Sequence, residues 1–496
     1  MGFKRSLPAA TDYERIFHPK RLAIIGVSQE GNVFGSGMIL SLKDIGYSGE
    51  IYPVNPKGGT FAGLDIYRSV EEIPEEIDFA VIAVSARNVP EALDACRKKG
   101  AAGAEILSAG FKELGTPEGI ALEEEIKRIA ARGIRVVGPN CFGIYCPASG
   151  LTVLPGPDLS RKSGPLAFLA QSGGMSIDFA ATGKWMGLNF SKLVSFGNGA
   201  DLRETELLDY LGRDAATGII AMYIEGIEEG DAFFSTLREV TRHKPVVIYK
   251  GGLSAAGQRA VTSHTASLGG NKAIWEAVLR QCGAVQVGNL WEMAETCLAF
   301  TLLPERVYRG MTVIGGGGAL GVAACDAAEA AGVELPILSG EIHDRIMAVL
   351  PKPGSSAGNP IDIASPMVDV AMQREVLRSA ASDDRVDIQL MIQLFYHLRH
   401  MAVRMGAKSV KEVVPYRELA DMVRQVVDET GKPVVLILPN HKQDLQYLDI
   451  EEMMREARQA FVDRGIPVFD DLNRAFTAIG HVSDYTARKN GRTALH

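Results

Sequence analysis

His264 is the histidine of this chain whose surroundings best suit chemistry. It lies in residues 260–270, a segment of small hydroxyl side chains and glycines without bulky core residues. Such a segment can donate hydrogen bonds to an anion, and a neutral imidazole near pH 7 is a competent nucleophile toward phosphorus. A histidine that only caps a loop has the same sequence context. The pattern leaves two interpretations open, a phosphoryl carrier and a loop cap.

Glu225 is the carboxylate best placed to assist such a histidine. It ends the apolar run 218–225, which is typical of a buried strand. A carboxylate on the second ring nitrogen would orient an imidazole and raise its nucleophilicity. We therefore expect Glu225 to be the orienting group, and we interpret the other histidines, His441 among them, as structural.

Three glycine-rich turns follow predicted strands and begin predicted helices, at residues 26–37, 171–174 and 315–321. Bare backbone N–H groups at a helix N-terminus favour anions. A tight strand-to-helix connection explains any one of these turns, but three in one chain favour phosphate chemistry. The third contains a GxGxxG match, which alone is weak evidence for a dinucleotide because no acidic residue ends the next strand. No GxxxxGK[ST] motif occurs, so no Walker-type nucleotide site is expected.

Lys57 follows Asn55 and Pro56 at the end of another predicted strand. Pro56 stiffens this turn, and the ammonium group would present a point charge to a phosphate. A solvated surface lysine fits the sequence equally well.

The composition excludes several classes of protein. The chain has 496 residues, 53 of them glycine, with 52 Lys and Arg against 60 Asp and Glu. A net charge of −8 argues against nucleic acid as a partner. No apolar run reaches the ~18 residues of a membrane span. The six cysteines are dispersed without a CxxC pair, which argues against structural zinc and a disulfide scaffold and favours a cytoplasmic location.

Strands and helices alternate along the first 147 residues. Short apolar runs predict buried parallel strands at 21–26, 51–55, 78–84, 104–108 and 134–138. Helical spacing between them predicts helices at 33–45, 88–99 and 117–132. This alternation predicts a doubly wound parallel sheet, whose ligands bind beyond the carboxyl ends of the strands.

The remainder contains an internal repeat, and a Pro- and Gly-rich stretch at 147–165 precedes it as a linker. The first copy has predicted strands at 164–170, 218–225 and 244–250; the second has them at 311–314, 386–394 and 432–438, with KPVV in both. Each copy has flavodoxin-like size and order. The predicted architecture is three doubly wound α/β domains at 1–147, 160–303 and 308–496.

Several segments together resemble one family. They are AIIGVSQEGNVFGSGMIL, IYPVNPKGG, DFAVIAVSARNVPEAL, SAGFKELG, GIRVVGPNCFGI, LAQSGGMSIDFA, SFGNGADL, MYIEGIEE, KPVVIYKGGLSAAGQRAVTSHTASLGG and GGGGALGVAACDAAEAAGVELPILS. In this order they resemble the α-type part of the NDP-forming acyl-CoA synthetases, which include ADP-forming acetyl-CoA synthetase and, more distantly, succinyl-CoA synthetase. The resemblance covers most of residues 15–370, and residues 370–496 match mainly in layout.

The resemblance implies a fold and a reaction. The fold would be a Rossmann-like CoA-binding domain followed by two flavodoxin-like domains of the succinyl-CoA synthetase type. The reaction would be acyl-CoA + Pi + ADP ⇌ acid + CoA + ATP, through an acyl phosphate and a phosphohistidine at His264 oriented by Glu225.

The resemblance also implies binding residues. Two helix N-termini would bind phosphate, through Ser172, Gly173, Gly174, Gly316, Gly317 and Gly318. Strand-end loops of the first domain would bind coenzyme A, through Gly26, Ser28, Asn55, Lys57, Val84, Ser85, Ser108, Phe111 and Asn140. No metal ligand is expected in this chain.

The family divides catalysis between a CoA-binding half and an ATP-grasp half, and the second half has no counterpart in these 496 residues. We therefore expect a separate ATP-grasp β chain that binds ADP or ATP and Mg²⁺, and an assembly that is either a hetero-oligomer or a homodimer. The substrate would be a small acyl-CoA or carboxylic acid. The segments TASLGG and IGGGGAL stand where the family more often has TGSLAG and a TNAGG-like turn. Because small residues replace small residues, we expect the chemistry to be retained, while the choice of substrate can differ.

Two other functions remain open. A CoA-binding protein without ligase activity would bind CoA without phosphorylation of His264. A nicotinamide oxidoreductase, which rests on the GxGxxG match, would bind NADH with no effect of CoA.

Overall fold

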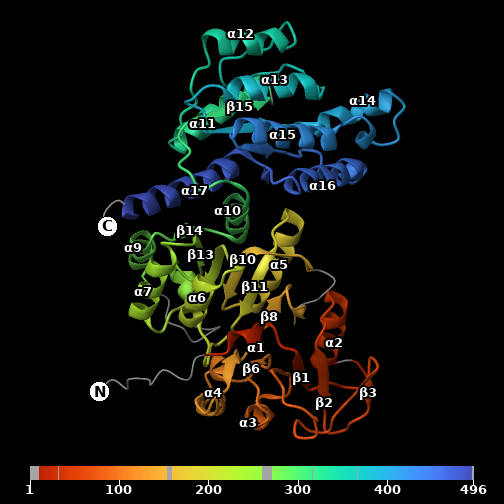
Figure 1. The fold of residues 1–496 in the computed structure, drawn as a ribbon, viewed down its shortest axis with the longest axis vertical. Coiled ribbons are helices and arrows are strands. Elements are labelled where there is room, and N and C mark those ends of the chain that lie inside the picture. Colours follow the sequence, from red (N-terminus) through yellow and green to blue (C-terminus); the bar gives the residue numbers. More distant parts are fainter. Residues whose placement is uncertain are drawn as a thin grey trace. The chain divides into compact units, whose positions relative to one another are not determined.

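The computed structural model describes residues 11–31, 33–152, 159–259, 271–315, 317–365 and 367–493. The chain divides into two compact units, Met1–Met293 and Ala294–His496 (Figure 1). The first unit contains two large sheets and the second contains one. The division into three domains stays a prediction, since the two larger sheets of the first unit share one compact body.

The first sheet is parallel throughout and has the strand order β2-β1-β5-β6-β7. Its strands are β1 (Arg21–Ile25), β2 (Glu50–Val54), β5 (Phe79–Ile82), β6 (Gly103–Ile106) and β7 (Arg135–Val137), as the apolar runs predict. A small hairpin of β3 (Thr60–Phe61) and β4 (Leu64–Asp65) follows β2. The strand order reverses between β1 and β5, and this reversal is where a doubly wound sheet binds its ligand.

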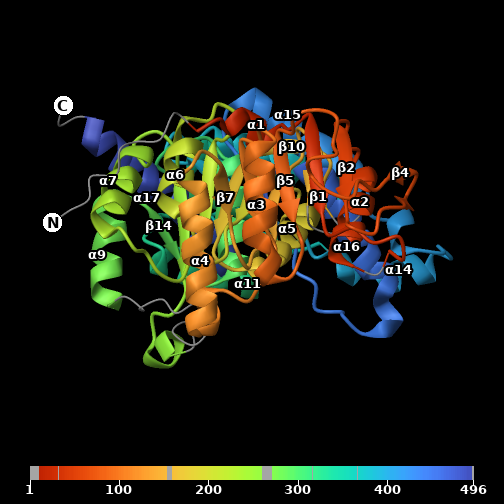
Figure 2. The ribbon, with the colours of Figure 1, turned by 90° about the horizontal axis from the view of Figure 1, so that it is seen from below.

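Alternating side chains of the first sheet reach two different cores. Leu22 and Ile24 pack with helix α2, whereas Ala23 and Ile25 face the core that contains α3 and α4. Figure 2 shows α3 and α4 side by side across one face of this sheet. The helices and 3₁₀ turns of this part are α1 (Tyr13–Phe17), α2 (Phe34–Ile45), η1 (Ala86–Asn88), α3 (Val89–Lys98), η2 (Lys112–Leu114) and α4 (Pro117–Ala130).

The second sheet has the order β14-β13-β12-β10-β11-β8-β9. Its parallel strands are β10 (Ser163–Ala170), β11 (Phe190–Ser195), β12 (Ile219–Ile224), β13 (Val246–Lys250) and β14 (Val285–Val287). Counted from β10, this is the 2-1-3-4-5 order of flavodoxin-like folds, which confirms the predicted class. The helices are α5 (Gly173–Met186), α6 (Glu204–Arg213), α7 (Gly230–Val240), α9 (Lys272–Cys282) and α10 (Leu290–Leu302).

Two short antiparallel strands extend the second sheet toward the first. They are β8 (Gly143–Cys146), which pairs with β11, and β9 (Leu151–Thr152), which pairs with β8 (Figure 1). Because β8 directly follows the last loop of the first sheet, it fixes that loop against the end of β11. The sequence did not predict β8, β9 or β11.

The second unit contains a four-stranded parallel sheet in the order β15-β16-β17-β18. Its strands are β15 (Met311–Gly315), β16 (Ile388–Ile392), β17 (Val434–Ile437) and β18 (Val468–Phe469). Two isolated parallel bridges pair Gly310 with Glu334 and Ile314 with Ile361. Their partner segments take the place beside β15 that β11 takes beside β10 in the second sheet. The predicted repeat is therefore visible as the same pairing of first and third strands.

Helices surround this sheet and bury one continuous core. They and the 3₁₀ turns are α11 (Gly318–Ala330), α12 (Gly340–Val349), α13 (Val370–Ala381), η4 (Phe395–Leu398), α14 (Arg399–Arg404), η5 (Val410–Glu412), α15 (Tyr416–Thr430), η6 (Leu445–Tyr447), α16 (Leu448–Val462) and α17 (Leu472–Thr493).

Side-chain caps explain where several of the helices begin. Thr116 accepts the N–H of Gly119 at the start of α4, and Pro117 occupies the first helical position. Asp369 accepts the N–H of Met372 at the start of α13. Ser172 does the same for Met175 at the start of α5, which places a capped helix end at the carboxyl edge of the second sheet.

Candidate functional site

A cavity of about 410 Å³ in the first unit joins the carboxyl ends of both of its large sheets. The first sheet contributes strand-end loops, and the second contributes the start of α5 and the loop after β11. The lining residues are Phe34, Ala83, Leu107, Ser108, Asn140, Cys141, Phe142, Gln171, Ser172, Gly173, Gly174, Gly197 and Asn198. Residues predicted separately for coenzyme A and for phosphate therefore line one cavity.

Ser108 and Asn140 are the predicted CoA residues that line it. The Ser108 hydroxyl donates to the carbonyl of Val84, and the Asn140 N–H donates to the carbonyl of Ser108 at 2.9 Å. Asn140 has a φ of +56°, a backbone conformation that few residues other than glycine adopt. Val84 and Ser85 belong to the neighbouring loop but do not line the cavity themselves.

Four other predicted CoA residues lie in the turns that follow β1 and β2; they are Gly26, Ser28, Asn55 and Lys57. Gly26 has a φ of +102°, and a Cβ there would lie 2.4 Å from the carbonyl oxygen of Ala83. Asn55 Nδ2 donates to the carbonyl of Val27 at 2.6 Å, and its Oδ1 accepts the N–H of Lys57 at 2.9 Å.

Ser28 and Lys57, the other two residues of these turns, differ in their contacts. The Ser28 N–H donates to Ser36 Oγ at 2.9 Å, which ties the glycine turn to α2. Lys57 is exposed, and its ammonium group forms no hydrogen bond with a described residue. These residues shape the loops beside the cavity without lining it.

Phe111 is fully buried in the core under α4. Its ring therefore does not reach the cavity that Ser108 and Asn140 line. Its N–H donates to Glu113 Oε1 at 3.1 Å, so its local role is to shape the 3₁₀ turn η2.

The start of α5 supplies the predicted phosphate-binding residues. Ser172 caps the helix, and the first turn contains no acidic residue that would neutralise the positive end of the helix dipole. Gly173 packs against a ring, since a Cβ there would lie 2.0 Å from Phe142. Gly174 is open, with nothing closer to such an atom than Ser172 Oγ at 4.0 Å. This end of the helix can approach an anion closely.

Glu225 follows β12 at the strand-order reversal of the second sheet, beside the start of α5. Its N–H donates to Gln171 Oε1, and Gln171 Nε2 donates back to the carbonyl of Gly226 at 2.9 Å. The Tyr223 hydroxyl donates to Glu225 Oε1 at 3.1 Å. Glu225 is 6% exposed, and its buried Oε2 has no hydrogen-bond partner among the described residues. This oxygen can accept a further N–H.

Lys250 ends β13 directly beside this carboxylate turn. Its ammonium group donates to the carbonyls of Glu225, at 2.6 Å, and Gly251, and lies 5.2 Å from the ring centre of Trp275. Burial lowers the pKa of Lys250 from 10.5 to about 8, although the Glu225 carboxylate opposes this shift. The amine therefore loses its proton at a lower pH than an exposed lysine does, directly beside the Glu225 turn.

Two of the predicted residues, His264 and Gly316, lie outside the described residues. His264 follows β13 in the chain, and β13 pairs with β12, at whose end Glu225 lies. Its role stays a prediction.

The glycine turn of the second unit lies at a corresponding strand-order reversal. Gly317 and Gly318 begin α11, and Gly317 lines a cavity of about 240 Å³ together with Gln373 and Gln393. Both glutamines are buried, and Gln393 Nε2 donates to Gln373 Oε1 at 3.1 Å. A Cβ at Gly318 would lie 3.6 Å from Asp362 Oδ2.

Sequence reasoning named Gln171 only as part of a glycine-rich turn, and it did not single out Phe142 or Asn198, which also line the first cavity. Asn198 follows β11, whose residues 190–195 (FSKLVS) show no regular apolar pattern, so the sequence did not place it at a strand end. The backbone at Phe142 is held by its N–H, which donates to Ser195 Oγ at 3.1 Å. That contact depends on the pairing of β8 with β11, which no local pattern reveals.

The described residues lack two further features. Among these residues, no three His, Cys, Asp or Glu side chains gather as a metal site. Within the same ranges, no helix has the length and hydropathy of a membrane span. Burial raises the pKa of the Cys141 thiol, which argues against a thiolate nucleophile in the cavity.

Comparisons with known proteins define the class of this fold and site. A family model described as "CoA binding domain" matches residues 20–147, and one described as "Succinyl-CoA ligase like flavodoxin domain" matches residues 163–300. The α subunit of ADP-forming acetate–CoA ligase I from Pyrococcus furiosus is 33% identical, over 94% of this chain and 96% of the relative. The chain therefore belongs to the family of ADP-forming acyl-CoA ligases.

Two further matches agree with this assignment. ADP-forming acetate–CoA ligase I from Archaeoglobus fulgidus is 38% identical over 76% of this chain, which spans 54% of that relative's length. The solved structure of a dinucleotide-forming acetyl-coenzyme A synthetase 1 from Ca. Korarchaeum cryptofilum, in complex with phosphate and ADP, matches with a TM-score of 0.79. It is 29% identical and covers 98% of this chain and 99% of its own. The relatives therefore include chains of about this length and longer chains.

Proposed function

We propose that this chain is the α-type subunit of an ADP-forming acyl-CoA synthetase, which interconverts acyl-CoA, phosphate and ADP with the free acid, CoA and ATP. One observation carries the proposal: the buried Glu225 carboxylate has an unpartnered oxygen beside the open N-terminus of α5, in the unit that also contains the CoA binding domain. A carboxylate and a helix end, side by side, suit an imidazole and a phosphate.

The reaction has three steps. An oxygen of inorganic phosphate attacks the thioester carbonyl, the carbon–sulfur bond breaks, and CoA leaves as the thiol after taking a proton. The His264 imidazole then attacks the phosphorus of the acyl phosphate, and the free acid leaves. ADP finally takes the phosphoryl group from His264. Catalysis is positioning and electrostatic stabilisation, since no covalent group other than the histidine is required.

The residues of the chain have separate roles in these steps. Glu225 Oε2 accepts the N–H of the imidazole nitrogen that does not attack, which fixes the ring and stabilises its positive charge. The N–H groups of Gly173 and Gly174 face the phosphate, and the α11 turn at Gly317 and Gly318 supplies a second anion site. Loops that contain Lys57 and Ser108 bind coenzyme A.

A second chain completes the enzyme in this proposal. The Pyrococcus furiosus relative is an α subunit, and the solved structure holds ADP and phosphate. The partner would be an ATP-grasp β chain that binds ADP or ATP with Mg²⁺, and the substrate would be a small carboxylic acid.

Phosphorylation of His264 tests the proposal. The full chain is mixed with a candidate ATP-grasp chain, Mg²⁺ and γ-labelled ATP, and acid-labile label on this chain is measured. We expect label on the wild-type chain and on the control variant His441→Ala, and none on His264→Ala. A chain that binds CoA but takes up no label, either from ATP with the partner or from acyl phosphate, would instead be a CoA-binding protein without ligase activity.

A further inference from the structure

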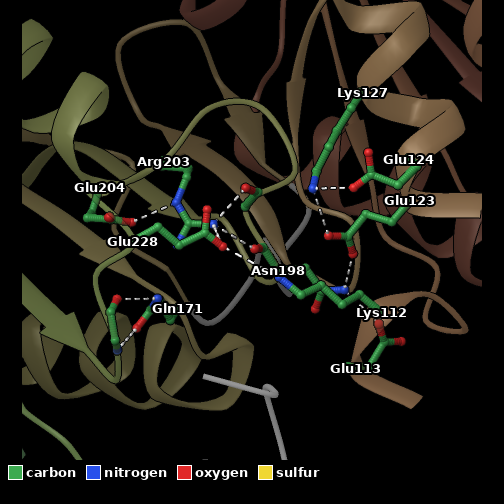
Figure 3. Close-up of polar contacts among 12 residues, drawn as sticks. Lys112, Glu113, Glu123, Glu124, Lys127, Gln171, Asn198, Arg203, Glu204 and Glu228 are labelled. Atoms are coloured by element: carbon green, nitrogen blue, oxygen red, sulfur yellow. Dashed lines mark hydrogen bonds and ion pairs between the residues drawn. The ribbon is translucent and has the colours of Figure 1, made fainter. Parts of the chain in front are cut away.

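Two buried side chains hold the backbone of the turn that carries Glu225. Gln171 Oε1 accepts the N–H groups of Glu225 and Gly226, and Gln171 Nε2 donates to the carbonyl of Gly226 at 2.9 Å (Figure 3). Lys250 Nζ donates to the carbonyl of Glu225 at 2.6 Å. These four contacts satisfy every backbone polar group of the two turn residues. The direction in which the Glu225 side chain leaves the turn is therefore fixed.

Lys250 supplies its contact at the point where the pairing of β12 with β13 ends. Ile224 and Lys250 are the last paired residues, and the Gly251 N–H donates to the carbonyl of Ile224 at 2.9 Å. The next carbonyl along β12 is that of Glu225, and the Lys250 ammonium group is its donor among the described residues. The same group donates to the carbonyl of Gly251. One buried side chain thus ties the Glu225 turn to the start of the segment that follows β13.

The positive charge of Lys250 strengthens these hydrogen bonds. Lys250 is 3% exposed, and its ammonium group lies 5.2 Å from the ring centre of Trp275 on α9. The charged group that acts on it is the Glu225 carboxylate; burial raises the pKa of the nearby Tyr223 well above its usual range, so that hydroxyl stays neutral. Hydrogen bonds from a charged donor are roughly twice as strong as neutral ones. Loss of the Lys250 proton should therefore loosen the turn, although the neutral amine can still donate.

The far end of the turn has weaker anchors, which Figure 3 also shows. Glu228 Oε1 lies 3.1 Å from Arg203 Nη1 and 3.5 Å from Lys112 Nζ, but the Glu228 side chain is 54% exposed. Exposed ion pairs stabilise little, because water and salt screen them. The buried contacts of Gln171 and Lys250 therefore determine where Glu225 points.

A second lysine makes the same kind of contact at the opposite end of β13. Lys244 Nζ donates to the carbonyls of Leu211, at 2.9 Å, and Asp214, at 2.7 Å. Burial lowers the pKa of Lys244 as well. Its contacts lie at the amino edge of the sheet, whereas the candidate site lies at the carboxyl edge. A comparison of the two lysines can therefore separate a structural role from a role in the site.

We infer that Lys250 is a positioning residue for phosphoryl transfer, because its ammonium group fixes the turn that aims the Glu225 carboxylate. The inference rests on the proposed function, in which this carboxylate orients the imidazole that takes the phosphoryl group. A misdirected carboxylate leaves the imidazole unoriented, so the rate of transfer should fall. Binding of coenzyme A should be retained, since the loops proposed for it belong to the first sheet.

The test measures phosphorylation of the full chain by labelled acetyl phosphate, without a partner chain, from about pH 7 to about pH 9.5. An imidazole is neutral throughout this range. We expect the wild-type rate to fall about fivefold with a midpoint near pH 8, as the ammonium group loses its proton. Lys250→Met should be about 30-fold slower than wild type at pH 7, with a rate that no longer depends on pH. Lys244→Met is the matched control and should keep the wild-type pH profile and, within about twofold, the wild-type rate.

Binding of coenzyme A, measured by calorimetry, should stay within about twofold of wild type in both variants. An equal loss of rate in Lys250→Met and Lys244→Met would overturn the inference, as would a matching loss of CoA affinity in Lys250→Met, since both indicate a structural role. An alkaline fall that persists in Lys250→Met would also overturn it. If Lys250→Met does not fold, the wild-type profile decides, and a constant rate across the range would overturn the inference. A folded wild-type chain that takes up no label would contradict the proposed function instead.

Discussion

The turns that follow β12 and β16 occupy the same place in two sheets of the repeat, yet one contains a carboxylate and the other a carboxamide. Glu225 follows the last residue of β12, and Gln393 follows the last residue of β16. Both strands pair with the first strand of their sheet, and both turns face a glycine-rich helix start. A polar side chain therefore lies at each strand-order reversal, but only the one after β12 is a carboxylate.

The next strand of each sheet continues this difference. Ile224 of β12 pairs with Lys250, whereas Ile392 of β16 pairs with Ile437. The first turn thus has a buried carboxylate and a buried amine, and the second has two glutamines bonded to each other. Only the first can stabilise a cationic imidazole, while the second can bind a ligand through neutral hydrogen bonds.

Glu225→Gln makes the first turn resemble the second and should have the largest effect. The amide keeps the shape and an acceptor oxygen but loses the negative charge that stabilises the imidazolium. We expect kcat for acyl-CoA synthesis with the β chain to fall by about 100-fold or more. Glu229→Gln, which changes an exposed carboxylate at the start of α7, is the control and should keep wild-type kcat. An unaltered kcat in Glu225→Gln would exclude this carboxylate from catalysis.

Gln393→Glu is the reverse exchange and should destabilise the second unit. It buries a carboxylate whose side-chain neighbour among the described residues is the Gln373 carboxamide, at a cost of about 3 kcal/mol at pH 8. Burial raises the pKa of such a carboxyl group, so the folded state binds the proton more tightly than the unfolded state. The loss should therefore shrink as the pH falls toward 5.

Denaturant unfolding at both pH values measures this effect. Gln443→Glu, at an exposed position of the same unit, should be neutral at either pH. Equal stability of Gln393→Glu and wild type at pH 8 would show that the second turn tolerates charge, and the contrast between the two turns would then lose its physical basis.

The lowered pKa of Lys250 should make the stability of the first unit depend on pH. The corresponding position after β16 pairs with Ile437 and gives no such dependence. The pKa of Lys250 is about 8 in the folded chain against 10.5 ordinarily, so between these values the unfolded state holds more protons. Stability therefore rises with pH across this window, by up to about 2 kcal/mol. Lys250→Met should abolish the rise, although it lowers stability throughout by leaving two carbonyls unpaired. Lys272→Met, at an exposed position, should keep the wild-type slope in the same denaturant titration.

Local sequence pattern predicted the parts of the site that depend on strand ends. Ser108, Asn140 and the Ser172 turn all follow buried apolar runs, and the parallel arrangement brings strand ends to one edge. The pattern could not predict the contacts between sheets. Asn198 meets Glu113 and Glu123 only because β8 pairs with β11 and draws the two edges together.

Gly26 and Phe111 show a second limit of predicting a site from sequence. The glycine at position 26 was predicted to face a ligand, but its nearest neighbour is the Ala83 carbonyl, so close packing of two loops suffices to require it. Phe111 shows the converse, since a residue in a strand-end loop can turn its ring into the core. Loop position predicts proximity to a site, whereas burial and neighbours decide the side chain's role.

The two glycine turns offer the finest comparison, because the same substitution should have opposite outcomes. Gly173→Ala would place a Cβ 2.0 Å from the ring of Phe142, whose backbone N–H is bonded to Ser195. The ring or the helix start must shift, and we expect a loss of about 1 to 2 kcal/mol in unfolding free energy together with weaker phosphate binding. Gly318→Ala meets only Asp362 at 3.6 Å, so helix propensity should make it neutral or stabilising by up to about 1 kcal/mol. Calorimetric melting of both variants measures these differences, and a stable Gly173→Ala with wild-type phosphate affinity would mean that Phe142 moves freely and that the α5 turn does not need its bare backbone.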